Sequence, residues 1–258
     1  QSVDLGWGTV FGGQVLGQAL SAAVQTVPVE RHVHSLHAYF LRKGDVSRPI
    51  VYEVDRIRDG SSFTTRRVVA VQAGRPIFNL AASFQKQELG FEHAELMPDA
   101  PAPESVEPDV DELAGSGTAI VRANRPFELR TIDRQDDLLS PTPLPPRRRV
   151  WMRARGKLPD SPPLHAYLLA YASDYSFLTT ALLPHGATWH KPGMQSASLD
   201  HVMWFHQPMR VDEWLLYVMD SPAAGGARGL VRGSIYTRDG RLVANTAQQG
   251  LLRVHASP

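Results

Sequence analysis

Alternating apolar and polar residues mark four strand-like runs in the first third of the chain, behind one helical run. Residues 10–27 carry small and apolar residues at helical spacing, with two glycines near the N-terminal end, and predict a helix that packs closely on a sheet. Turn signals such as RDGS and AGRP separate the strand-like runs, which lie at 33–42, 50–57, 62–73 and 76–85. This spacing predicts an antiparallel meander with the helix covering one face.

The same order recurs in the second half of the chain. A helical run at 164–183 precedes strand-like runs at 197–206, 214–220, 229–238 and 241–253, and a further strand-like run, 149–155, comes before it. At an offset of 166 residues, VVAVQAGRPIFNLAASF parallels SIYTRDGRLVANTAQQG, with the hairpin Gly-Arg and a later Asn in register. We therefore predict an α+β fold in which one helix-on-sheet unit is used twice and the two sheets are joined.

Composition changes between the two units. Residues 86–113 carry nine acidic residues and the Pro-rich MPDAPAPESVEPD, which is typical of a surface linker. We predict a first repeat at 1–87, an acidic Pro-rich linker at 88–115 and a second repeat at 116–258. Because the chain starts at Gln1 rather than Met, we expect the first repeat to be incomplete at its N-terminus.

Charge and residue usage narrow the classes of partner and compartment. The net charge is +1, so we expect no nucleic-acid partner. The chain has no cysteine, which excludes disulfides, thiolate zinc sites and a Cys nucleophile, and fits a reducing compartment. No apolar run approaches the ~20 residues that span a bilayer, so we expect no membrane span. The expected location is the cytoplasm, although a targeting signal in a missing N-terminal segment stays open.

A carboxylate stands out in the apolar stretch LLAYASDYSFLTT, residues 168–180. Helical spacing places Asp174 on one face with Tyr171 and Phe177, and no Lys or Arg lies between Lys157 and Lys191. Burial without a cation would raise the pKa of this carboxyl group, which suits a general base near neutral pH. The alternative is that Asp174 is solvated at the edge of that face or caps a break in the helix.

Extra polarity also distinguishes the last strand-like run of the second half. Gln248, in ANTAQQGLL, aligns with Ala82 of the first half, where the sequence reads LAASF. One of Gln248 and Gln249 must face water by strand alternation, and the sequence does not say which.

Taken together, these blocks resemble the type II acyl-CoA thioesterases, which have a double hot-dog fold. The resemblance covers nearly the whole chain and rests on these blocks in order: VFGGQVLGQAL, VHSLHAYFLRKGD, RDGSSFTTRRVVAVQ, YASDYSFL, ASLDHVMWFH and ARGLVRGSIYTRDGRLVANTAQQGLLR. It implies hydrolysis of fatty acyl-CoA without a cofactor, and a homo-oligomer such as a dimer or tetramer. The family's catalytic Asp, Ser or Thr, and Gln fall on Asp174, Ser198 and Gln248, all in the second repeat.

This residue set offers no covalent nucleophile with an adjacent base, so we expect water to attack the thioester. Asp174 would take the proton of that water, while Ser198 and Gln248 would orient both. The backbone N–H groups of Gly12 and Gly13 are candidate donors to the oxyanion and the substrate. Alternatively, these glycines serve only helix packing.

Other candidate features point less clearly to function. His32 and His34 share a strand face, but no carboxylate pattern supports a metal site, and we predict none. Asp200 and His201 are adjacent on a strand and face opposite ways, so they cannot act as a close pair. Arg66, Arg67 and the cluster at 147–149 could meet CoA phosphates or form a solvated basic face.

Two rival functions remain. An enoyl-CoA hydratase of the same fold is disfavoured because the nearest string to its motif, GDVSRP, has no following His. The other rival is a catalytically silent acyl-CoA-binding protein, since fold alone does not fix function.

Overall fold

The computed structural model describes residues 2, 8–109, 125–135 and 137–255. The first half comprises α1 (Gly12–Val24), β1 (Arg31–Phe40), β2 (Val51–Asp59), β3 (Phe63–Gln72) and β4 (Arg75–Lys86). The second half comprises β5 (Phe127–Thr131), β6 (Arg147–Ala154), α3 (Pro162–Ala172), α4 (Phe177–Leu182), β7 (Met194–Ser198), β8 (Asp200–Phe205), β9 (Leu215–Gly225), β10 (Arg228–Thr237) and β11 (Leu242–Val254). Short 3-10 helices lie at η1 (Pro103–Ser105) and η2 (Leu183–His185).

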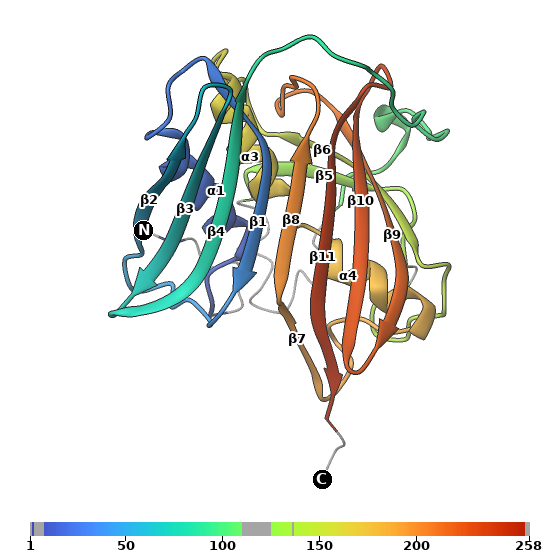
Figure 1. The fold of residues 1–258 in the computed structure, drawn as a ribbon. Coiled ribbons are helices and arrows are strands. Elements are labelled where there is room, and N and C mark those ends of the chain that lie inside the picture. The colour runs from blue at the N-terminus through green and yellow to red at the C-terminus, as the bar shows by residue number, and fades with distance from the viewer. Residues whose placement is uncertain (1, 3–7, 110–124, 136, 256–258) are drawn as a thin grey trace.

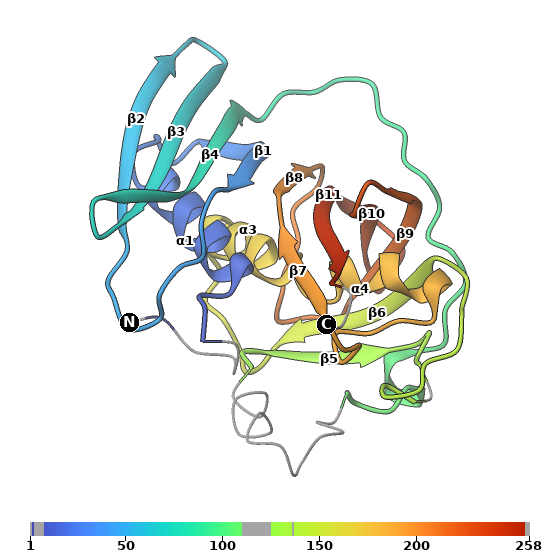
Figure 2. The same cartoon turned by 90° about the horizontal axis from the view of Figure 1, so that it is seen from below.

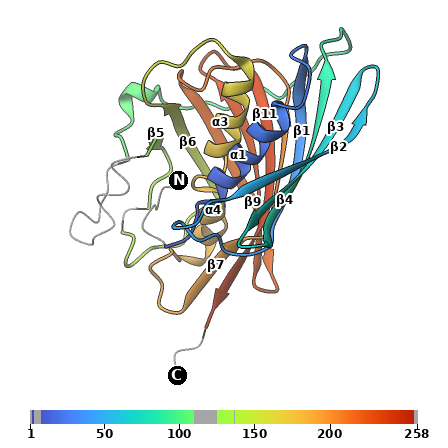
Figure 3. The same ribbon diagram turned by 90° about the vertical axis from the view of Figure 1, so that its left-hand side faces the viewer.

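The strands of the described residues form a single antiparallel sheet with the order β2-β3-β4-β1-β8-β11-β10-β9-β6-β5, and β7 pairs with β11. The two halves meet where β1 pairs with β8, from Ser35 opposite Trp204 to Tyr39 opposite Asp200 (Figure 1). Helices α1 and α3 lie side by side on the concave face of the sheet (Figures 2 and 3). The predicted arrangement of two helix-on-sheet units with joined sheets is therefore confirmed.

Strand alternation places the main core between the sheet and the helices. On β1, Leu36 and Ala38 point inward and are buried, while His37 and Tyr39 point outward and are exposed. The same alternation continues across the seam, because Met203 on β8 stands opposite Leu36 and is also buried. The helices thus close one continuous core over both halves.

Two glycines one helical turn apart let α1 approach α3 backbone to backbone. A Cβ atom at Gly17 would lie 2.8 Å from the carbonyl oxygen of Tyr167, and one at Gly13 would overlap that of Tyr171. The sequence predicted close packing of these glycines on a sheet. The structure shows that the helix of the other repeat is what they contact.

Residues 97–109, here called the strap, cross the outer face of the second half (Figure 1). Beneath the strap lies a second, smaller core, made of Trp151, Trp214, Leu216 and Tyr236 with Met97, Ala100 and Val106. The indole N–H of Trp151 donates to the carbonyl oxygen of Pro101 at 2.9 Å. This part of the predicted linker is therefore packed against the second repeat. The last predicted linker residues, 110–115, lie outside the described residues, and the proposed repeat boundaries stay a prediction.

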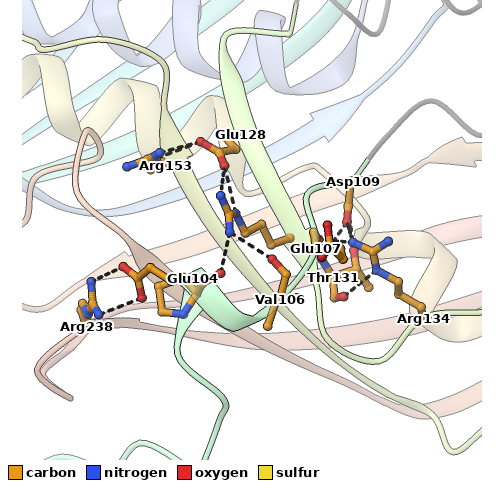
Figure 4. Close-up of polar contacts among 11 residues, drawn as sticks. Glu104, Val106, Glu107, Asp109, Glu128, Thr131, Arg134, Arg153 and Arg238 are labelled. Carbon is orange, nitrogen blue, oxygen red and sulfur yellow. Dashed lines mark hydrogen bonds and ion pairs between the residues drawn. The ribbon is translucent and has the colours of Figure 1, made fainter.

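Ion pairs and hydrogen bonds hold the strap along its length (Figure 4). Arg238 binds both carboxylate oxygens of Glu104, at 2.7 and 2.9 Å. Arg130 donates to the carbonyl oxygens of Pro103 and Val106, at 2.8 and 3.0 Å. Further along, Asp109 accepts hydrogen bonds from Thr131 and Arg134, and Glu128 accepts hydrogen bonds from Arg130 and Arg153. Most of these groups are partly exposed, so positioning of the strap depends on the set rather than on one pair.

Three details differ from the sequence prediction. The helix predicted at 164–183 is broken into α3 and α4, and the strand predicted at 197–206 divides into β7 and β8 at Leu199. The edge strand β5 was not predicted, although FELRT alternates with the period of a strand. Among the described residues, no helix is both long and apolar enough to cross a membrane.

Candidate active site

A sharp turn between α3 and α4, residues 173–176, carries Asp174. Ser176 adopts a left-handed backbone conformation with φ of 59°, which is strained for a residue with a side chain. The hydroxyl of Thr179 donates to the carbonyl oxygen of Ser176 at 2.6 Å and stabilises the start of α4. The prediction that Asp174 lies within one continuous helix is therefore wrong, because the helix breaks at this turn. The alternative that Asp174 caps the break is not confirmed either, since its carboxylate accepts the N–H of Gly13 on α1.

Nevertheless, the carboxylate of Asp174 points into the protein and is held by donors from both halves. Its Oδ2 accepts the backbone N–H of Gly13 at 2.9 Å. The donor groups of the Gln248 and Ser198 side chains also lie beside this carboxylate and favour its ionised form. Burial outweighs these donors and raises the pKa of Asp174 to about 7. The group is thus poised to exchange a proton near neutral pH.

Aromatic rings from α3, the following turn and the residue before α1 pack together near Asp174. Phe11 stacks on Tyr175 with ring centroids 4.9 Å apart and meets Tyr171 edge-on at 5.3 Å. The hydroxyl of Tyr175 donates to that of Tyr171 at 3.0 Å. Burial, with a smaller effect from the charge of Asp174, raises the pKa of both tyrosines, so their hydroxyls remain neutral beside the carboxylate.

Gln248 and Ser198 come together beside Asp174 from neighbouring strands. Gln248 is buried on the inner face of β11, and its Nε2 donates to the hydroxyl of Ser198 at 2.8 Å. Ser198 ends β7 and stands opposite Gly250 on β11. The structure therefore brings the three sequence-predicted residues into one cluster. It also shows that Gln249 is the outward member of its pair.

His201 belongs to the same cluster and was missed as a functional candidate. It is fully buried on the inner face of β8, with Nδ1 2.5 Å from Oε1 of Gln248 and Nε2 2.9 Å from the hydroxyl of Ser173. Burial lowers the pKa of His201 to about 4, so the ring is neutral at pH 7. The sequence contained the signal, because strand alternation places His201 on the same face as Met203.

The adjacent Asp200 instead anchors the backbone on the outer face. Its Oδ1 accepts the backbone N–H of Gln249 at 2.6 Å. As predicted, Asp200 and His201 face opposite ways and do not act as a pair.

Gly12 leaves the space that the Asp174 carboxylate occupies, whereas Gly13 leaves space for the backbone of Tyr171 and the ring of Phe11. A Cβ atom on Gly12 would lie 2.7 Å from Oδ2 of Asp174 and 3.0 Å from the ring of Phe40. The N–H of Gly13 is directed to the carboxylate, so this amide positions Asp174. Both glycines therefore have a packing role at the site.

The arginines considered for CoA phosphates are mostly engaged within the protein. Arg66 is buried and donates to Asp59, to the carbonyl oxygens of Arg58 and Thr65, and to both oxygens of Thr26. This network makes Arg66 a structural residue.

Three of the remaining basic candidates also have partners within the protein. Arg67 pairs with Asp55 at the surface, and Arg149 binds both carboxylate oxygens of Asp133. Arg148 donates to the hydroxyl of Thr179 at 2.9 Å.

No group of three or more potential metal ligands occurs within the described part of the chain. His34, one of the two histidines weighed as ligands, hydrogen-bonds the hydroxyl of Ser83 at 2.8 Å.

Comparison with known proteins gives consistent matches over both halves. A family model described as acyl-CoA thioesterase matches residues 123–251, and one described as the acyl-CoA thioesterase N-terminal domain matches residues 3–85. Acyl-coenzyme A thioesterase 8 of Mus musculus is 43% identical over 260 residues, which cover 95% of this chain and 80% of the mouse protein.

Solved structures agree with these matches. The crystal structure of the acyl-CoA thioesterase II TesB2 from Mycobacterium marinum has a TM-score of 0.82 and 46% identity, covering 95% of this chain and 90% of that chain. A conserved protein with a hot-dog fold from Alicyclobacillus acidocaldarius has a TM-score of 0.78 at 21% identity, covering 96% and 89%, and bears on the fold alone. The predicted double hot-dog fold is thereby confirmed.

Proposed function

Since the chain belongs to the acyl-CoA thioesterase family, we propose that it hydrolyses fatty acyl-CoA by means of a water molecule that Asp174 activates together with Ser198 and Gln248. The observation that carries this assignment of roles is the state of the Asp174 carboxyl group. Its pKa is raised to about 7 by burial, it accepts the N–H of Gly13, and the donor groups of Gln248 and Ser198 lie beside it. A carboxylate in this state can take a proton at neutral pH and return it later in the reaction.

In the proposed reaction, the oxygen of water attacks the carbonyl carbon of the thioester while Asp174 takes one proton of that water. The tetrahedral intermediate then collapses, the C–S bond breaks, and the sulfur of CoA leaves with the proton from Asp174. The products are a free fatty acid and CoA. Ser198 and Gln248 hold the water and the carboxylate in place, and such positioning is a large source of rate.

A donor to the oxyanion is still required. The N–H of Gly13 is directed to Asp174, so within the predicted pair the role falls to the N–H of Gly12, at the first residue of α1. This role stays a prediction, as do the homo-oligomer, the cytoplasmic location and a place in lipid metabolism.

The decisive test replaces Asp174 with an uncharged residue of the same shape. Asp174→Asn should fold normally and lose about 10²–10⁴-fold in kcat, because the amide cannot take a proton from water. Release of the free CoA thiol across short, medium and long acyl-CoAs provides the measurement. Asp200→Asn is the matched control, since Asp200 is on the outer face and its remaining amide oxygen can still accept the N–H of Gln249.

Near wild-type turnover by Asp174→Asn on several acyl-CoAs would overturn the proposed roles. If the wild-type chain itself released no thiol, the alternative of an acyl-CoA-binding protein without catalysis would be favoured.

A further inference from the structure

Four side chains form a continuous hydrogen-bonded series that ends at Asp174. The hydroxyl of Ser173 contacts Nε2 of His201 at 2.9 Å, and Nδ1 of His201 contacts Oε1 of Gln248 at 2.5 Å. Nε2 of Gln248 in turn contacts the hydroxyl of Ser198 at 2.8 Å. The side chains of Gln248 and Ser198 both reach the carboxylate. The ionised carboxylate of Asp174, at one end of this series, determines which groups donate and which accept.

An ionised carboxylate only accepts hydrogen bonds, so Gln248 must present its NH₂ group to Asp174 and Ser198. The carbonyl oxygen of Gln248 then faces Nδ1 of His201. Two acceptors cannot share a hydrogen bond, so Nδ1 must carry a proton. Because the ring is neutral at pH 7, its Nε2 carries none and is an acceptor that faces the hydroxyl of Ser173 at 2.9 Å.

The other neutral tautomer of His201, with the proton on Nε2, is incompatible with a hydrogen bond from Gln248 to Asp174. With the proton on Nε2, Nδ1 would require a donor, and the carboxamide of Gln248 would turn by 180°. Its carbonyl oxygen would then face Asp174, and the hydrogen bond from Gln248 to the carboxylate would be lost. The tautomer of His201 therefore decides which end of Gln248 the site uses.

We propose that His201, as the neutral Nδ1–H tautomer, is a positioning residue that holds the carboxamide of Gln248 with its NH₂ group toward Asp174 and Ser198. This inference rests on the proposed roles of these residues in thioester hydrolysis. His201 does not exchange protons with the substrate; it acts through Gln248. Ser173 supports the tautomer from the other side of the ring, although its single hydroxyl proton can also go to the carbonyl oxygen of Ala170, 2.8 Å away.

Other ionisable groups face this cluster. Tyr171 and Tyr175 lie beside Asp174, and their hydroxyls are neutral because burial raises their pKa values. Tyr217 of β9 donates to the carbonyl oxygen of Ser173 at 3.1 Å, and burial raises its pKa too. Arg125 lies over the ring of Tyr175, 5.4 Å from its centroid. These groups keep their charge states near neutral pH, so Asp174 is the group that titrates there.

The direct test reads the tautomer in the intact wild-type protein. NMR of the chain labelled with ¹⁵N-histidine distinguishes a protonated from an unprotonated ring nitrogen, and the loss of signals in His201→Asn assigns this residue among the ten histidines. We expect a protonated Nδ1 and an unprotonated Nε2 at pH 7 to 8. A proton on Nε2 instead would overturn the proposal, whatever the activity of any variant.

A pair of variants tests the consequence for catalysis. His201→Leu removes the donor, and its kcat should fall about tenfold to a hundredfold, as expected for a misplaced catalytic group. The acid limb of its pH–rate profile should move to higher pH, because a lost hydrogen bond to the ionised carboxylate raises the pKa of Asp174. His201→Asn keeps an amide N–H near the position of Nδ1. It should retain most of the wild-type kcat and most of the wild-type pH–rate profile. A purely structural role would not move the limb or separate these two variants.

A double-mutant cycle shows whether His201 acts through Gln248. In a Gln248→Ala background, His201→Leu and His201→Asn should have the same kcat, since no carboxamide is left to orient. Unequal rates in that background would overturn the proposal. Wild-type kcat and pH profile in His201→Leu, with Asp174→Asn inactive, would also overturn it and leave the proposed function intact. Activity in Asp174→Asn would reject the proposed function instead, and the NMR result would still stand.

Discussion

At the scale of single residues, the site depends on one carboxyl group whose pKa is set by opposing effects. Burial desolvates Asp174 and raises its pKa, while the donor groups of Gln248, Gly13 and Ser198 lower it. Desolvation has the larger effect, so Asp174 is mostly protonated in the folded protein below neutral pH. The ionised form of this carboxyl group therefore costs the folded protein stability at neutral pH.

This cost predicts a pH-dependent gain of stability in Asp174→Asn. The pKa of Asp174 is about 7 in the folded state and about 3.9 in an unfolded chain, so its favourable contribution is complete below pH 4 and is lost as pH rises through 7. Relative to wild type, Asp174→Asn should gain about 2–8 °C in melting temperature between pH 5 and pH 8. Thermal melts of both proteins across this range provide the measurement. A constant difference between them would show that Asp174 is not desolvated.

The catalytic candidates could be predicted from the sequence, whereas the residues around them could not. Asp174 was conspicuous because its neighbours are apolar, and Gln248 because the first repeat has Ala82 at the same place. Which glutamine faces inward depends on strand register, which places Gln248 beside His201 and leaves Gln249 outside. His201 was missed because its partners, Gln248 and Ser173, are 47 and 28 residues away in sequence.

At the scale of elements, the turn between α3 and α4 is what delivers Asp174 to the site. Local signals for it are weak, because the stretch SDYS contains neither Gly nor Pro, although Ser and Asp also favour turns. The turn is held from the sheet: Tyr217 of β9 donates to the carbonyl oxygen of Ser173, and the same hydroxyl contacts Thr246 of β11 at 2.8 Å. A window of sequence around residue 174 could not reveal contacts that come from two distant strands.

The left-handed residue of this turn offers a test of its strain. Ser176→Val should destabilise the protein by about 1–2 kcal/mol, because a β-branched side chain is disfavoured at a φ of 59°. Ser176→Gly should be close to neutral, since relief of strain offsets the greater freedom of the unfolded chain. Urea unfolding of the two variants compares them directly. Equal stability of Ser176→Val and Ser176→Gly would mean that the turn relaxes without this conformation.

At the scale of the whole molecule, the site belongs to neither repeat alone. Asp174 comes from the second repeat, and the N–H that positions it comes from Gly13 of the first. Contact between α1 and α3 at Gly13 and Gly17 brings these groups together. The internal repeat was visible in the sequence, but the contact between repeats was not, because helix packing leaves no periodic signature across 150 residues.

Gly13 and Gly17 lie on the same face of α1. Substitutions at these two positions distinguish docking of the repeats from positioning of the carboxylate. Gly13→Ala should reduce kcat by about 10²-fold, because the new methyl group meets the backbone of Tyr171 and displaces the N–H from Asp174. Gly17→Ala, the matched control, meets α3 one turn away and should cost about 1–3 kcal/mol of stability with kcat changed only severalfold. Kinetics and urea unfolding of both variants provide the measurement. Equal losses of kcat would contradict a specific role for Gly13.

An exposed segment joins the end of β4 at Lys86 to the strap and so links the two halves. Residues 87–96 form no helix or strand, and Leu89, Phe91 and Leu96 are almost fully exposed. This segment works as a tether: it makes the docking of two unlike halves an intramolecular event, at an effective concentration on the order of millimolar. The interface through β1, β8 and the paired helices can therefore be modest in intrinsic affinity and still keep the site assembled. The effective concentration depends only weakly on the length of the tether. Changes in the length of this segment should therefore be tolerated better than changes in the surfaces that it joins.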